Sequence, residues 1–82
     1  MSRAVLRISS SREVDRQAGD LALRVWESGQ GTYEAAMAIR VHLESIREPV
    51  PALSLAQAYA ANVIDRHQDA LYAARQQKAQ RA

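Results

Sequence analysis

Two short breaks divide this chain into three segments, each with the length and apolar spacing of an α-helix. Gly29-Gln30-Gly31 is the one glycine-rich stretch, and Pro49-Val50-Pro51 contains both prolines of the 82 residues. Glycine suits the left-handed residue that ends a helix, and proline disfavours helix in the residue before it. Because apolar residues recur at helical spacing between the breaks, the sequence predicts helices at about residues 11–28, 33–46 and 55–78.

The apolar residues of these segments are mostly small. Alanine dominates, phenylalanine is absent, and the aromatic residues are Trp26, Tyr33, Tyr59 and Tyr72. Alanines allow helices to approach closely, but each alanine removes little apolar area from water. A chain of this length forms one domain with a thin core. We therefore predict a mainly α domain over residues 1–82 that is dimeric, because a second copy would bury more apolar surface.

Serines and glycines mark the predicted helix ends. Ser10 with Glu13 has the spacing of a capping box, and Ser54 opens the third helix in the same way. Gly19 lies inside the first helix, where glycine costs about 1 kcal/mol relative to alanine. Either a close helix contact or a tolerated defect explains it. The last turns of the third helix, from about residue 75, have almost no apolar face, so we expect a basic tail that projects and frays.

Residues 3–9 form the one segment with the alternating pattern of a β-strand. Two sets of side chains alternate there, with Ala4, Leu6 and Ile8 on one side and Arg3, Val5, Arg7 and Ser9 on the other. This pattern predicts a short N-terminal strand ahead of the three helices. Since a single strand cannot satisfy its own backbone donors and acceptors, it would pair with the same strand of a second copy. A frayed N-terminal arm is the alternative.

Positive charge is concentrated at both ends of the chain. The only charged side chains before Glu13 are three arginines, and those after Asp69 are two arginines and one lysine. All nine acids lie between these ends. Such a layout suits contact with a polyanion such as duplex DNA. Basic ends that only keep a small helical protein in solution are the alternative.

Residue types that carry catalysis or bind metals do not converge in this sequence. Cysteine is absent, and His67 lies two positions from both Asp65 and Asp69, so it does not share a helix face with them. His42 has no nucleophile nearby, and we interpret it as a structural histidine. We predict no enzymatic activity, no cofactor and no metal. Because no segment approaches the ~20 apolar residues of a membrane span, we expect no membrane contact and a cytoplasmic location.

Four pieces of residues 3–46 follow one another in a recognisable order: the alternating Arg3–Ile8, Arg12-Glu13-Val14, the Gly29 turn and Ala38–Glu44. In this order they resemble the ribbon-helix-helix family of repressors and antitoxins. The resemblance implies that strands from two subunits pair antiparallel in the DNA major groove, while the start of the second helix contacts a phosphate. Carried onto this chain, it implies base contacts by Arg3, Val5 and Arg7 and phosphate contacts by Gly31 and Thr32.

Two functions remain open at this point. The first is a small homodimeric DNA-binding protein of the repressor or antitoxin type, which regulates transcription by reading duplex DNA with the basic strand. The second is a helical protein–protein interaction module, such as a phage- or plasmid-encoded inhibitor or adaptor of a bacterial protein. That module would bind its partner through the third helix, with Trp26, Tyr59 and Tyr72 as anchors. The strand separates the two, since only the DNA reader needs Arg3 and Arg7 to face outward together.

Overall fold

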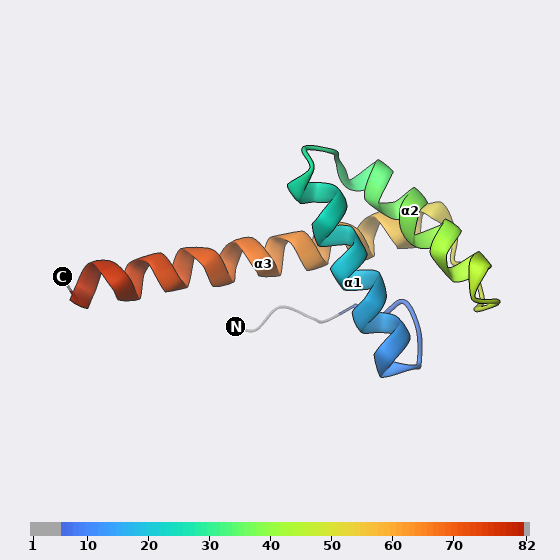
Figure 1. Cartoon of the computed structure of the whole chain (residues 1–82), viewed down its shortest axis with the longest axis horizontal. Helices are drawn as coiled ribbons and strands as arrows, with labels where there is room; N and C mark the ends of the chain where they lie inside the picture. The colour runs from blue at the N-terminus through green and yellow to red at the C-terminus, as the bar shows by residue number, and fades with distance from the viewer. Residues whose placement is uncertain (1–5, 82) are drawn as a thin grey trace.

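Three helices of unequal length make up the computed structural model, which describes residues 6–81 and the side chains of residues 6–79. They are α1 (Arg12–Glu27), α2 (Thr32–Ser45) and α3 (Leu53–Arg81). All three pack against one another, with α1 crossing the first half of α3 and α2 lying along its first part (Figure 1). The mainly α class and the three predicted helices are therefore confirmed.

The ends of α1 show how local sequence sets the helix bounds. The hydroxyl of Ser11 accepts a hydrogen bond from the backbone N–H of Val14 at 3.3 Å, so Ser11 is the N-cap, one residue after the predicted Ser10. At the other end, Gly29 takes a φ of +91° and the N–H of Gln30 bonds to the carbonyl oxygen of Val25 at 3.3 Å. This left-handed glycine ends α1 as the sequence predicts.

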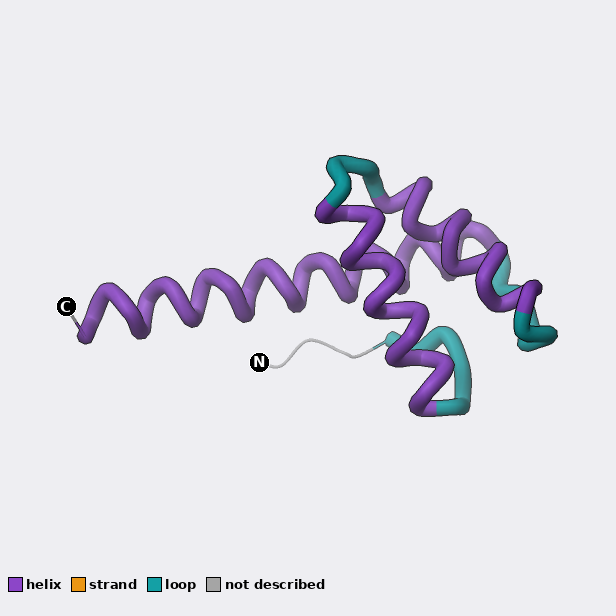
Figure 2. The backbone as a smooth tube through the Cα atoms, in the orientation of Figure 1, coloured by secondary structure: helices purple, strands orange, loops and turns teal. Residues whose placement is uncertain are grey.

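The end of α2 has the same geometry without a glycine. Arg47 takes a φ of +59°, and the N–H of Glu48 bonds to the carbonyl oxygen of Leu43 at 2.9 Å. A side chain in the left-handed region costs about 1–2 kcal/mol, so this turn stores strain that the Gly29 turn avoids. The two loops that follow the turns connect α1 to α2 and α2 to α3 (Figure 2).

The predicted N-terminal β-strand is wrong. Residues 3–5 lie outside the described residues, and no strand occurs in residues 6–81. Residues 6–11 instead run as an irregular segment beside α1, where the N–H of Ile8 donates a hydrogen bond to Oδ1 of Asp15 at 2.7 Å. Leu6 and Ile8 pack against the core. The alternating pattern therefore arises because Leu6 and Ile8 both cover a helical core. The backbone N–H of Ile8, which would bond to a neighbouring strand in a sheet, donates to the carboxylate of Asp15 instead.

The core lies where the three helices meet, and alanines make up most of it. Its buried residues are Ala18, Ala22, Ala35, Ala36, Ile39, Leu43, Ala56, Tyr59, Ala60 and Ile64. Small side chains let the helix axes approach, and Tyr59 fills the space that the alanines leave. Most of this set lies on the apolar stripes that the sequence predicts, but Tyr59 was expected at the surface.

The second half of α3 extends beyond the core. From Gln68 to Ala79 every side chain is exposed, while α1 and α2 cover only the part of α3 before that point (Figures 1 and 2). A helix of 29 residues is about 43 Å long, and the molecule measures 49 × 27 × 20 Å. We call residues 68–79 the α3 arm. The expected projection is present, and the helix continues to Arg81 rather than ending near Lys78.

Candidate partner-binding surface

Of the residues expected to contact DNA, those that the structure describes belong to separate segments of the chain. Arg3 and Val5 lie outside the described residues, and Arg7 is exposed in the irregular segment before α1. Gly31 and Thr32 are exposed at the start of α2. The irregular segment leads into the N-terminal end of α1, whereas the start of α2 follows the loop after the C-terminal end of α1 (Figure 1).

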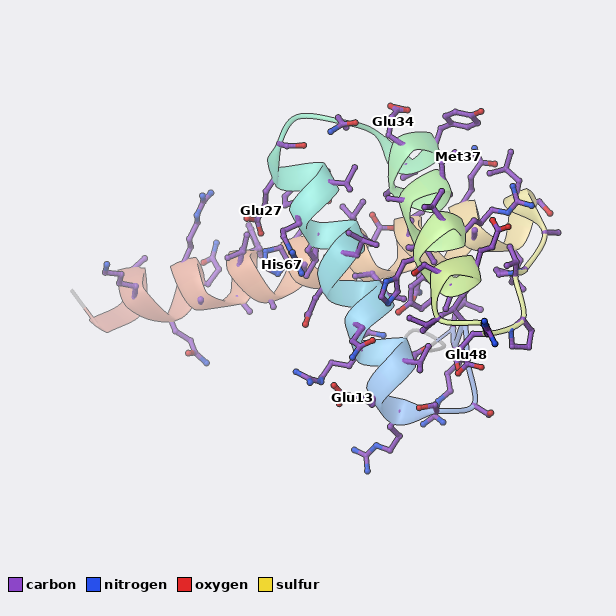
Figure 3. All side chains as sticks on the ribbon, turned by 45° about the vertical axis from the view of Figure 1, so that its right-hand side comes forward. Glu13, Glu27, Glu34, Met37, Glu48 and His67 are labelled. Carbon is purple, nitrogen blue, oxygen red and sulfur yellow. The ribbon has the colours of Figure 1, made fainter. Side chains whose placement is uncertain are left out.

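The start of α2 is also occupied by an acid of its own helix. Oε1 of Glu34 accepts a hydrogen bond from the backbone N–H of Gly31 at 3.2 Å. A phosphate would need such a free N–H, and the Glu34 carboxylate places a negative charge beside it. Figure 3 shows Glu34 at this end of α2. The local electrostatics are therefore unfavourable for the phosphate contact that the resemblance implies.

The three expected aromatic anchors have different surroundings. Tyr59 is only 2% exposed, and its hydroxyl donates a hydrogen bond to the backbone oxygen of Asp15 at 2.8 Å. Burial, and next the negative charge of Asp15, raise the pKa of Tyr59 to about 12. Tyr59 is thus part of the core and is not a surface anchor. Trp26 is half-buried at the end of α1, and Tyr72 is 66% exposed on the α3 arm.

A hollow lies where the end of α1 meets the α3 arm. We call it the Trp26 hollow; its volume is about 470 Å³ and its lining residues are Trp26, Gln68, Asp69, Leu71, Tyr72 and Arg75. The ring of His67 meets the ring of Trp26 edge-on, with 5.9 Å between ring centroids and 82° between ring planes. Figure 3 places His67 on α3 beside the C-terminal end of α1. Trp26 therefore packs against His67 and also lines the hollow, on the side nearest the core.

The apolar residues of the α3 arm share one face of the helix with the hollow. Gln68, Leu71, Tyr72 and Arg75 are spaced three or four positions apart, so their side chains lie next to one another. Leu71 is 45% exposed and Tyr72 is 66% exposed. Two large apolar side chains are therefore exposed beside an indole ring, on the part of α3 where every described side chain is exposed.

The charge of the α3 arm is positive toward its end. Residues 68–81 contain one acid, Asp69, and three bases, Arg75, Lys78 and Arg81, which gives a net charge of −1 + 3 = +2. Arg75 and Lys78 continue the helix face that starts at Leu71, because they follow it by four and seven positions. The candidate surface thus has Trp26, Leu71 and its single acid, Asp69, at one end and a basic end near the C-terminus.

No cluster of three His, Asp or Glu side chains between residues 6 and 79 is placed to hold a metal ion. His67 contacts Trp26, and Nε2 of the half-buried His42 lies 3.4 Å from Oε1 of Gln17. No helix in the described part of the chain has both the length and the apolar content needed to cross a bilayer.

Comparison with known proteins gives no relative from which to transfer a function. A scan against protein-family models, and searches of curated proteins and of solved structures, found no match.

Sequence reasoning missed part of this surface. The sequence pattern does not single out Leu71, and it places Arg75 and Lys78 in a basic tail that frays. The signal that could have found them is the length of that helix, since partners of 16 and 14 residues cannot cover one of 29. The Trp26 hollow itself depends on where α1 crosses α3, which spacing alone does not give.

Proposed function

We propose that this protein is a helical protein–protein interaction module that binds a partner through the α3 arm and the Trp26 hollow. The observation that carries this proposal is the exposure of Leu71 and Tyr72 on a helix that extends past the core. Aromatic and aliphatic side chains that line a hollow are the usual centres of binding energy in interfaces. A module of this size would act as an inhibitor or adaptor of a larger protein.

The energetics of the α3 arm support a bound state. A helix segment of about twelve residues is marginal in water on its own, and within the described residues the arm meets α1 only around Trp26. Burying a leucine side chain fully contributes about 1.5–3 kcal/mol. A partner that covers Leu71, Tyr72 and the open side of Trp26 would therefore stabilise the arm and gain affinity at the same time.

The DNA-binding hypothesis loses its main support. It requires a ribbon of two paired strands, and the described residues contain none. It also places a phosphate at the start of α2, where the Glu34 carboxylate accepts the N–H of Gly31 and adds a negative charge. The homodimer expected from the sequence stays a prediction, and light scattering of the isolated chain tests it.

Photo-crosslinking in the cells that produce the protein tests the proposed function. A photoreactive phenylalanine derivative replaces Tyr72 in one variant and Val41 in a matched control, because Val41 on α2 is 63% exposed. We expect a discrete cross-linked species from position 72 that is absent from position 41. Adding Leu71→Glu to the first variant should remove that species. Equal cross-linking from both positions, or none from position 72, would contradict the proposal.

A further inference from the structure

We propose that the occupant of the α3 arm is an amphipathic helix of a partner protein, about three turns long, with an apolar stripe and an acidic flank. This inference rests on the proposed function and specifies the chemistry of the partner. The apolar stripe packs into the Trp26 hollow and onto Leu71. The acidic flank lies against Arg75 and Lys78.

Helical shape in the partner follows from the shape of the surface. The arm is a continuous α-helix whose backbone groups are satisfied within the helix, so it offers no edge to an added strand. A second helix can pack its side-chain ridges between those of Leu71, Tyr72 and Arg75. The arm is about 18 Å long at 1.5 Å per residue, which matches about three turns of a partner helix.

The charge of the surface selects an acidic partner. Arg75, Lys78 and Arg81 are the only residues after Asp69 with side chains charged at neutral pH, so a partner helix meets increasing positive charge toward the end of α3. Glutamates on the flank of the partner helix would complement these cations and raise the rate of association.

Two other occupants fit this surface less well. A second copy of the chain would bring its own Arg75 and Lys78 into the same interface, where like charges oppose association. A nucleic acid would complement the cations, but its phosphate backbone has no apolar surface that could cover Leu71. A helix with both an apolar stripe and an acidic flank complements the whole surface.

Fluorescence of Trp26 provides the test, because it is the single tryptophan of the chain and it lines the hollow. Three designed peptides without tryptophan are titrated into the full-length protein. The first has leucines at three- and four-residue spacing with glutamates on the flanks. The second has the same composition in scrambled order, and the third has lysine in place of every glutamate. Duplex DNA forms a fourth titration, and light scattering reports the mass of the isolated chain.

We expect the first peptide to change the Trp26 emission and to gain helical circular dichroism when it binds. Its affinity should fall at high salt, because exposed charge pairs are screened. The scrambled and lysine peptides should bind about tenfold more weakly or not at all. In variants, Leu71→Ser and the double change Arg75→Glu with Lys78→Glu should each weaken binding about tenfold or more. The control Val41→Ser should leave the affinity unchanged.

Other outcomes would overturn the inference. Equal affinity for the first and scrambled peptides would show that binding does not depend on the amphipathic arrangement of the peptide. Tighter binding of the lysine peptide or of DNA, or a dimer that Leu71→Ser dissociates, would assign the surface to a different occupant. Each variant is compared with wild type in its melting temperature, so that a folding defect is seen directly. If the peptides fail while the position-72 cross-link persists, the partner chemistry is wrong and the proposed function stands.

Discussion

The hydroxyl of Tyr59 donates a hydrogen bond of 2.8 Å to the backbone oxygen of Asp15, 44 positions earlier in the chain. The carboxylate of Asp15 in turn accepts the backbone N–H of Ile8 at 2.7 Å. One residue near the start of α1 therefore joins the N-terminal segment to α3 through two hydrogen bonds. These contacts hold the covered part of α3 in place, and so they set the direction in which the α3 arm projects.

Replacing Tyr59 with phenylalanine should lower the free energy of unfolding by about 1 kcal/mol, because it removes one buried hydrogen bond and leaves the aromatic ring. Urea unfolding at neutral pH measures this change. The change Tyr72→Phe is the control, since Tyr72 is exposed and its hydroxyl should contribute little. Equal stability of Tyr59→Phe and wild type would contradict the expected role of the hydrogen bond.

The same tyrosine should make stability sensitive to alkaline pH. Burial raises the pKa of Tyr59 to about 12 from 10.0, so the folded state keeps this proton more tightly than the unfolded state. Its contribution is complete below about pH 10 and is lost as the pH rises toward about 12. Urea unfolding across this range should show a steeper loss for wild type than for Tyr59→Phe. Parallel losses in the two proteins would contradict this assignment.

The change Gly19→Ala should alter the free energy of unfolding differently in wild type and in the Tyr59→Phe variant. A Cβ atom built on Gly19 would lie 3.2 Å from the hydroxyl oxygen of Tyr59, which the bond to Asp15 holds in position. In wild type this crowding should offset the helical preference for alanine, which is worth about 1 kcal/mol. With Tyr59→Phe the oxygen is gone, and Gly19→Ala should stabilise the protein by about that amount. A double-mutant cycle from urea unfolding measures the difference, and strict additivity would show that the two residues do not interact.

Arg47→Gly should stabilise the protein by about 1 kcal/mol. Arg47 has a φ of +59°, which glycine adopts without steric cost, and Arg47 is exposed, so no packing is lost. The opposite change, Gly29→Ala at a φ of +91°, should destabilise by a similar amount. Thermal unfolding of both variants checks the pair. A melting temperature for Arg47→Gly at or below wild type would argue against strain at this turn.

Much of the fold could be predicted from the sequence because the relevant signals are local. Gly29 and the segment around Pro49 end helices through their own backbone preferences, and Ala18, Ala22, Ile39 and Leu43 lie at helical spacing. The close contact at Gly19 with Tyr59 also decides between the two explanations for that glycine.

The features that could not be predicted depend on residues far apart in the chain. The alternation through Leu6 and Ile8 predicted a strand. In the structure the N–H of Ile8 donates a hydrogen bond to Asp15, and both apolar side chains pack against the core. Tyr59 was expected at the surface because composition does not reveal which aromatic residue faces the core. Its burial depends on α1 approaching α3 closely enough for the bond to Asp15.

Hydrogen–deuterium exchange of the isolated chain, at a concentration where light scattering shows a monomer, tests the central claim most directly. We predict strong protection of the α3 amides around Ala56 to Ile64, where α1 and α2 cover the helix, and rapid exchange from Gln68 onward. Adding the acidic amphipathic peptide should extend protection to Leu71 and Arg75. Strong protection of the α3 arm in the isolated monomer would contradict the account, because it would mean that the chain already covers the surface proposed for a partner.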